Sequence, residues 1–230
     1  MAYKSKRNKE IEKIIVEDKI YSTKEAIDLL KACPKVKFDQ TVDVAIDVNV
    51  DPKKHQVRGT ASLPNGTGKK LVVVVLTRSD MQQEAKDAGA DFVGDQELVD
   101  KIKGGWTGFS VLIVSPDMMR EVGKLGKILG PRGLMPSPKA GTVTNDIGKA
   151  VEEVKKGKIE FKLDKTAVIN TIIGKLTFET EKLEQNLKTL LSSVLANKPA
   201  ASKGSFFKSL FLSSTMGPGL KIDLQSLNLG

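Results

Sequence analysis

The chain has 230 residues, of which 37 are Lys or Arg and 28 are Asp or Glu, giving a net charge of +9. Its length and its apolar content of 40% are enough for one large or two modest packed domains. No apolar run approaches the roughly 18 residues that a membrane-spanning helix needs, and the basic N-terminus lacks the apolar core of a signal peptide. We therefore expect a cytoplasmic protein without a membrane partner. The basic balance favours a polyanion as its ligand.

The first 66 residues are predicted to combine amphipathic helices with half-exposed strands. A short helix is expected within residues 4–20, and the capping box at Ser22–Glu25 predicts the start of a second helix. Apolar and polar residues alternate from Val42 to Val50, which indicates a strand with one buried face. A further strand is expected around 57–63, and the turn-rich PNGTG cluster after it predicts a domain boundary.

From Leu71 to Gly157 the pattern is that of a small doubly wound α/β unit. The run LVVVVL is continuously apolar, as expected for a strand that is covered on both faces in a parallel sheet. Short apolar strands then alternate with helical segments in steps typical of this architecture. The strands are predicted at 71–76, 91–93 and 109–114, and the helices at 81–88, at 96–103, from 117 onwards and from 145 to 156.

After Gly157 the alternating pattern returns. Residues 159–163 and 168–172, joined by the turn Asp164–Lys165, predict a β-hairpin. A long amphipathic helix follows Thr180, and two strands, at 206–212 and 220–224, flank a loop at 213–219.

The two ends of the chain thus share one pattern, half-exposed strands with amphipathic helices, whereas the middle has the pattern of an α/β unit with buried strands. We predict an outer α+β domain, residues 1–66 with 159–230, into which a Rossmann-like α/β domain, residues 67–158, is inserted. Two chain crossings, near Gly66 and Gly157, would then form a two-strand hinge.

The composition leaves little room for catalysis or metal binding. Cys33 and His55 are the only residues of their kinds, so an internal disulfide, a cysteine zinc site and a multi-histidine metal centre are excluded. Neither a phosphate-binding loop nor a GxGxxG fingerprint has the required spacing. We predict no catalytic residue, no metal and no cofactor. The alternative is a cytosolic α/β enzyme that acts on a phosphorylated metabolite and uses a basic loop as its anion site.

That basic loop is the segment KLGKILGPRGLMPSPKAGTVT, residues 124–144. It carries four cations and no acid between Lys124 and Lys139, and the prolines at 131, 136 and 138 disfavour regular helix. Like charges this close repel one another unless a partner neutralises them. We therefore predict that the loop faces a polyanion.

Two other segments are candidate RNA contacts, residues 35–41 (KVKFDQT) and 213–219 (SSTMGPG). Phe38 could be a core residue and the second segment an ordinary turn. Alternatively, the aromatic ring, the short hydroxyls, the flexible Met216 and a bare glycine backbone form one surface that enters an RNA minor groove. Aromatic residues are scarce in the chain, so folded RNA is a better fit than a row of unstacked bases. Lys203 is expected to add affinity for phosphate.

The chain resembles the ribosomal protein L-one family, the mobile-stalk proteins of the large ribosomal subunit. The resemblance covers essentially the whole chain and is carried by YSTKEAIDLLK, KFDQTVDV, VRGTASLPNGTGK, LGPRGLMPSPKAGTVT, IEFKLDK and STMGPG. Asn65 and Asn170 stand where His is usual in the family. The resemblance implies an outer RNA-binding domain with an inserted α/β domain.

Several roles follow from the resemblance alone. It implies a monomer that binds the ribosomal RNA of the stalk, faces transfer RNA at the exit site, assists the release of deacylated transfer RNA, and represses translation of its own messenger RNA. The implied ribosomal RNA contacts are Phe38, Thr41, Ser214, Thr215, Met216 and Gly217, with Lys37 nearby. The implied contacts of the basic loop with transfer RNA are Lys127, Arg132 and Lys139.

Overall fold

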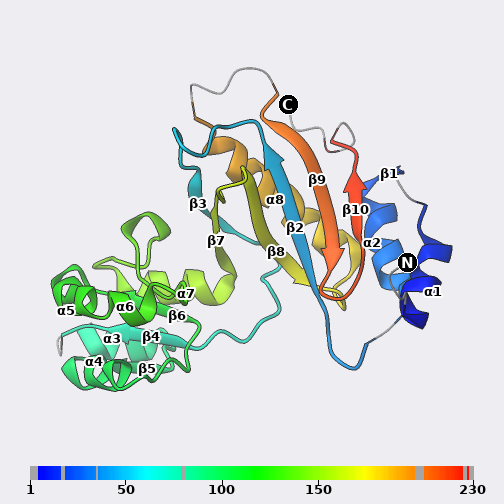
Figure 1. The fold of residues 1–230 in the computed structure, drawn as a ribbon. Coiled ribbons are helices and arrows are strands. Elements are labelled where there is room, and N and C mark those ends of the chain that lie inside the picture. Colours follow the sequence, from blue (N-terminus) through cyan, green and yellow to red (C-terminus); the bar gives the residue numbers. More distant parts are fainter. Residues whose placement is uncertain are drawn as a thin grey trace. The chain divides into compact units, whose positions relative to one another are not determined.

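A computed structural model describes residues 5–16, 19–34, 36–78, 81–199, 205–224 and 227. It is a mixed α/β structure with helices and several sheets (Figure 1), so the predicted fold class is confirmed. The chain divides into two compact units. The outer unit is Met1–Gly68 with Glu160–Gly230, and the inserted unit is Lys69–Ile159.

A five-stranded sheet in the order β1-β10-β9-β2-β8 forms the centre of the outer unit (Figure 1). The pairs β10/β9, β9/β2 and β2/β8 are antiparallel, and only β1/β10 is parallel. In β2 the alternate side chains Val42, Val44, Ile46 and Val48 are buried, as the sequence pattern predicts. The strands are β1 (Ile20–Tyr21), β2 (Thr41–Val48), β8 (Val168–Lys175), β9 (Phe207–Ser214) and β10 (Gly219–Ile222).

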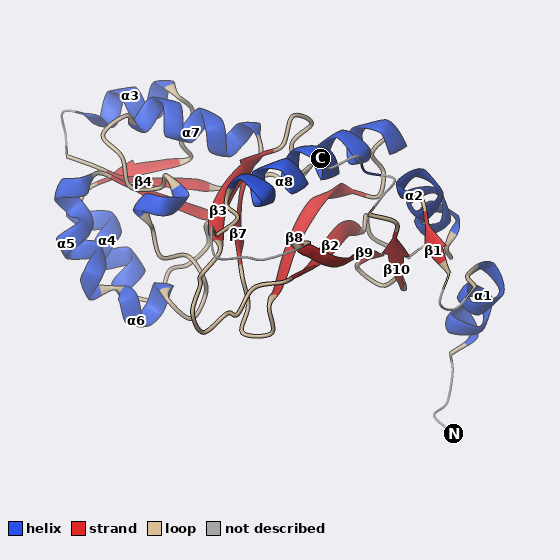
Figure 2. Cartoon of the chain, turned by 90° about the horizontal axis from the view of Figure 1, so that it is seen from above, coloured by secondary structure: helices blue, strands red, loops and turns tan. Residues whose placement is uncertain are grey.

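Two helices, α2 and α8, pack on this sheet, and Figure 2 shows α8 lying along one face of it. The predicted capping box at the start of α2 is present, since Ser22 Oγ accepts from Glu25 N and Glu25 Oε2 accepts from Ser22 N. The long helix α8 buries one stripe against the strands, which fixes the sheet's inner face. The helices of this unit are α1 (Lys6–Ile14), α2 (Thr23–Ala32) and α8 (Thr180–Ala196).

The predicted hairpin at 159–172 is wrong. Strand β7 (Lys158–Lys162) pairs with β3 (Arg58–Ser62) in a separate two-stranded sheet, whereas β8 pairs with β2. The turn at Asp164 does form, and the isolated bridge Leu163–Ile169 joins the two strands beside it. The buried residues of β8 include Ile169 and Ile173, which lie on the face opposite to that of Asn170. Long-range pairing with β2 therefore outweighs the local turn, because it buries this apolar set.

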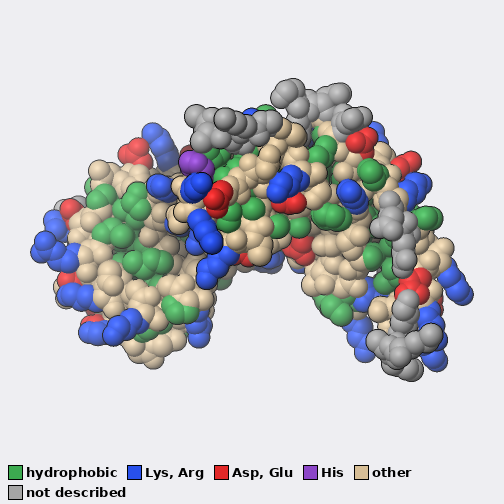
Figure 3. Space-filling view, turned by 45° about the horizontal axis from the view of Figure 1, so that its top comes forward, with side chains coloured by type: hydrophobic (Ala, Val, Ile, Leu, Met, Phe, Trp, Pro, Cys, Tyr) green, Lys and Arg blue, Asp and Glu red, His purple; other side chains and the backbone are tan. Residues whose placement is uncertain are grey.

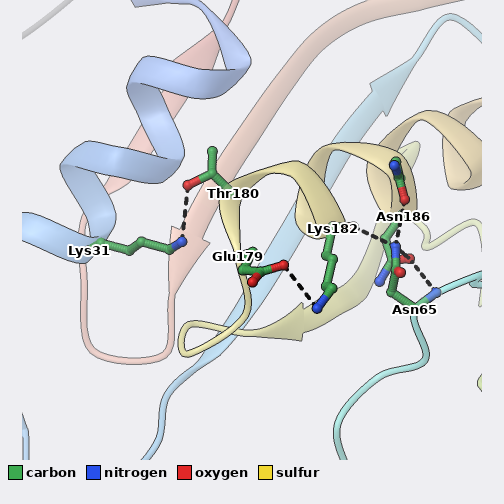
Figure 4. A network of polar contacts seen from close by, with 7 residues as sticks. Lys31, Asn65, Glu179, Thr180, Lys182 and Asn186 are labelled. Carbon is green, nitrogen blue, oxygen red and sulfur yellow. Dashed lines mark hydrogen bonds and ion pairs between the residues drawn. The ribbon is translucent and has the colours of Figure 1, made fainter.

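The turn at the end of the first chain segment is anchored to α8 through a buried amide. Asn186 is fully buried, and its Nδ2 donates to Gly66 O at 3.0 Å and to Ile173 O at 2.8 Å. Its Oδ1 accepts from Asn65 N at 3.1 Å, and Asn65 Nδ2 donates to Lys182 O (Figure 4). A buried amide with satisfied donors and acceptor fixes the backbone around it. Asn65 therefore has a structural role in this chain.

The inserted unit has a three-stranded parallel sheet in the order β5-β4-β6 with helices on both faces (Figure 2). One core cluster joins the sheet to α3 and α7, and the other joins it to α4, α5 and α6. All four residues of β4 are buried, as a strand covered on both faces requires. The elements are β4 (Val73–Leu76), α3 (Gln82–Asp87), β5 (Phe92–Gly94), α4 (Gln96–Lys103), β6 (Val111–Val114), α5 (Met119–Lys124), α6 (Gly126–Leu129) and α7 (Ile147–Lys156), with short 3-10 turns at Pro116–Met118 and Pro138–Ala140.

The basic loop is more regular than its composition predicts. Residues up to Lys124 belong to α5, and the short helix α6 buries Leu129 in the core before Pro131 is reached. The irregular part begins at Gly130, because only there do the prolines remove backbone donors. Gly133 and Gly141 have left-handed backbone, with φ of 68° and 69°.

Candidate nucleic-acid interface

Three segments meet at the end of the outer sheet where β2 begins and where β8 and β9 end (Figure 1). They are residues 37–41, residues 175–177 and residues 214–217, and we call them together the platform. In the register of the sheet, Thr41 lies opposite Lys175, and Val42 lies opposite Ser214. Strands that are remote in sequence therefore bring the two predicted RNA-contact segments together.

Hydrogen bonds join these segments directly. Thr215 N donates to Thr41 O at 3.1 Å, and Thr41 N donates to Thr215 Oγ1 at 3.0 Å. Met216 N donates to the side-chain Oε1 of the buried Gln40 at 3.0 Å. Because backbone and side-chain hydrogen bonds both join the turn 214–217 to residues 40 and 41, the turn has a fixed position relative to residues 37–41.

Two large apolar side chains of the platform are exposed to solvent. Phe38 is 54% exposed and Met216 is 57% exposed. Phe38 is thus not a core residue, which decides between the two alternatives that the sequence leaves open for it. Lys37 and Thr215 are exposed as well, and Thr41 is half-buried. Apolar groups that face water together are a feature of interaction surfaces.

Ser214 and Gly217 form the tightest point of the platform. Ser214 is only 3% exposed, and its Oγ has no hydrogen-bond partner among the described residues. Gly217 N donates to Ser214 O at 2.8 Å, and a Cβ added to Gly217 would lie 2.1 Å from Ser214 Oγ. A side chain at position 217 would therefore crowd Ser214.

Three other residues contribute to this surface, and none of them is among the predicted RNA contacts. Gln40 anchors Met216, Lys175 Nζ donates to Asp39 O at 3.0 Å, and Thr177 Oγ1 donates to Asp39 Oδ2 at 3.2 Å. For Gln40 the available sequence signal was its position directly before a predicted strand, within the candidate segment 35–41. No sequence signal pointed to Lys175 and Thr177, because their role depends on the pairing of β8 with β2.

The cations of the basic loop lie in the inserted unit. Lys127, Arg132 and Lys139 are all exposed, and Arg132 Nη1 donates to Thr107 Oγ1. Lys124, in contrast, forms an ion pair with Glu121 at 2.8 Å. Of the loop's four cations, only Lys124 forms an ion pair with a described residue. Lys203, the other cation expected to contact phosphate, lies outside the described residues, as does Lys35.

Charge is spread widely over the surface. On the face drawn in Figure 3, Lys and Arg side chains are scattered, with Asp and Glu between them. Within the part of the chain that the structure describes, no three His, Cys, Asp or Glu side chains are grouped to hold a metal ion. No helix in the same part combines the length and apolar character needed to cross a membrane.

A sequence model of the ribosomal protein L1p/L10e family matches residues 29–218, a range that includes the platform and the basic loop. The chain belongs to this family. It is 56% identical over 231 residues to the large ribosomal subunit protein uL1 of Protochlamydia amoebophila, an alignment that covers 100% of this chain and 98% of the relative. The predicted family is confirmed.

Two other relatives are also similar over most of the chain. The uL1 protein of Chlamydia caviae is 56% identical over 211 residues, covering 91% of each chain. That of Kosmotoga olearia is 51% identical over 229 residues, covering 99% of each chain. The relatives are named as ribosomal proteins and not as enzymes, so the alternative of a metabolic enzyme loses its support.

Proposed function

We propose that this protein belongs to the large ribosomal subunit in the cytoplasm, that it binds ribosomal RNA, and that the platform is its binding surface. Membership in a ribosomal protein family supports the first two parts. One structural observation supports the third. The bonds Thr41–Thr215 and Gln40–Met216 join segments more than 170 residues apart into one surface with exposed apolar side chains.

The groups on the platform suit the reading of RNA shape. The minor groove of an RNA helix is wide and shallow and displays 2′-hydroxyls, so short side chains and bare backbone can approach it closely. Thr41, Thr215 and the backbone at Gly217 supply such groups, and Phe38 and Met216 supply apolar contact. Lys37 and the other exposed cations add affinity for phosphate, which does not depend on sequence.

We assign RNA binding to the outer unit and treat the inserted unit as a second, hinged domain. The chain passes between the units at two points, near Gly68 and near Ile159. Left-handed glycines lie close to both, since Gly66, Gly68 and Gly157 have φ of 67°, 70° and 106°. Glycine adopts such backbone without strain, and hinge residues are often small.

Two finer roles, which the family resemblance implies, are part of the proposal. The exposed Lys127, Arg132 and Lys139 of the basic loop face transfer RNA at the exit site and assist its release after deacylation. The platform also binds a similar fold in the protein's own messenger RNA and represses its translation. The same surface serves both RNAs because it reads shape and backbone.

Filter binding to large-subunit ribosomal RNA at fixed salt tests the proposed surface. Met216→Asp and Thr215→Ala should each weaken binding, because the first places a negative charge on the platform and the second removes the hydrogen bond that Thr215 Oγ1 accepts from Thr41 N. Met81→Asp is the matched control, since Met81 is also exposed but lies in the inserted unit. Wild-type affinity for both platform variants would show that the surface has been assigned wrongly.

A further inference from the structure

A hollow of about 400 Å³ opens directly beside the platform, within the outer unit. It lies between the end of α2, the segment before β2 and the turn after β8. Five residues that line it also belong to the platform: Phe38, Asp39, Gln40, Leu176 and Thr177. An RNA held on the platform would therefore lie over the mouth of this hollow.

The wall of the hollow has the composition of a site for a flat, partly polar ring. Cys33, Val36 and Leu176 are its apolar part, and the half-exposed ring of Phe38 is available for stacking. Base–aromatic stacking contributes substantially to RNA binding wherever a base leaves its helix. Lys31 lies at the edge, where its Nζ donates to Thr180 Oγ1 at 3.0 Å (Figure 4).

Two polar side chains of the hollow have unused hydrogen-bonding capacity. Gln40 Oε1 accepts from Met216 N, and its Nε2 donates to no described residue. Asp39 Oδ2 accepts from Thr177, whereas Asp39 Oδ1 receives no hydrogen bond from a described residue. The lining of the hollow thus includes one amide donor and one carboxylate acceptor without a partner among the described residues.

We propose that this hollow receives an unstacked guanine of the bound RNA, an inference that rests on the proposed function of the platform. Guanine has two adjacent donors, N1–H and N2–H, beside the acceptor O6. The two donors match the carboxylate of Asp39, and O6 matches the side-chain amide donor of Gln40. Adenine and cytosine each place a ring acceptor next to their single exocyclic donor group, and uracil flanks its one donor with two carbonyls. A carboxylate only accepts, so guanine is the base it favours.

The test uses the full chain and large-subunit ribosomal RNA. Kethoxal reacts with N1 and N2 of unpaired guanine, so a guanine held against Asp39 should be protected in the wild-type complex. Asp39→Asn keeps the shape of the side chain but replaces one acceptor oxygen with a donor, and Val36→Trp fills the hollow. Each should weaken RNA binding about tenfold and make that guanine reactive at saturating protein.

Val16→Trp is the matched control, because Val16 is 63% exposed and lies elsewhere on the outer unit. It should leave both affinity and the kethoxal pattern unchanged. If Met216→Asp loses affinity while Asp39→Asn and Val36→Trp bind with the wild-type kethoxal pattern, the platform stands and the guanine site is refuted. If Met216→Asp also binds like wild type, the platform itself is refuted, and this inference with it.

Discussion

Gly217 offers the sharpest test of how the platform works, through the substitution Gly217→Ala. The new Cβ would lie 2.1 Å from Ser214 Oγ, 3.3 Å from Ser214 Cβ and 3.5 Å from Ser214 N. Gly217 is not among the residues with left-handed backbone, so an Ala is not strained there by its φ angle. The entire effect of the substitution must then come from crowding against Ser214.

The size of the effect follows from the burial of Ser214. Its side chain is only 3% exposed, so the hydroxyl has little room to rotate away and the turn must move instead. Overpacking of this kind costs about 1–3 kcal/mol. If RNA binding requires the original turn, the same cost appears in affinity, as a loss of about fivefold to 150-fold.

The assay compares three variants by urea unfolding and by filter binding to ribosomal RNA. Ser214→Ala alone should be close to neutral in stability, because its buried Oγ has no described partner to lose. Combined with Gly217→Ala, it removes the 2.1 Å contact and should restore most of the stability. Most of the affinity should return with it, because the methyl group points towards Ser214 and fits once the hydroxyl is gone.

Two results would refute this reasoning. Wild-type stability and affinity in Gly217→Ala would mean that the turn adapts freely, so that the platform is not rigid. Low affinity in the double variant despite restored stability would mean that crowding against Ser214 is not what weakens RNA binding in Gly217→Ala.

Three further predictions concern other parts of the molecule. Asn186→Leu removes four hydrogen bonds, two that its Nδ2 donates to Gly66 O and Ile173 O and two that its Oδ1 accepts from Asn65 N and Nδ2. The outer unit should therefore lose about 3 kcal/mol. Circular dichroism should report this loss, while the fluorescence of Trp106, in the inserted unit, stays unchanged. Alanine at all three exposed cations of the basic loop should lower the slope of log K against log salt for transfer RNA by about 2 to 3, and an unchanged slope would exclude the loop from phosphate contact. Burial raises the pKa of the Cys33 thiol above its ordinary value of 9.0. Alkylation of Cys33 in the folded protein should therefore stay slow past that pH and accelerate on unfolding. The folded state should also lose stability as the pH rises from the ordinary pKa of the thiol to its raised pKa.

Much of the fold could be predicted because its signals are local. The alternation in β2, the continuously apolar run in β4 and the capping box of α2 each depend on a few neighbouring residues, and all three are present in the structure. The hairpin at 159–172 failed because a turn signal says nothing about which strand is available as a partner. The two-residue strand β1 was missed because it is defined only by its pairing with β10.

The sequence by itself determined the class of the protein, its basic character, the absence of a disulfide framework and the family to which the chain belongs. It also marked residues 35–41 and 213–219 as unusual. Only the tertiary structure decided that these segments share one surface, that Phe38 is exposed, and that Gln40 holds Met216 in place. The physical reason is that hydrogen bonds across a sheet join residues more than 170 positions apart, and no local pattern records the distance between them.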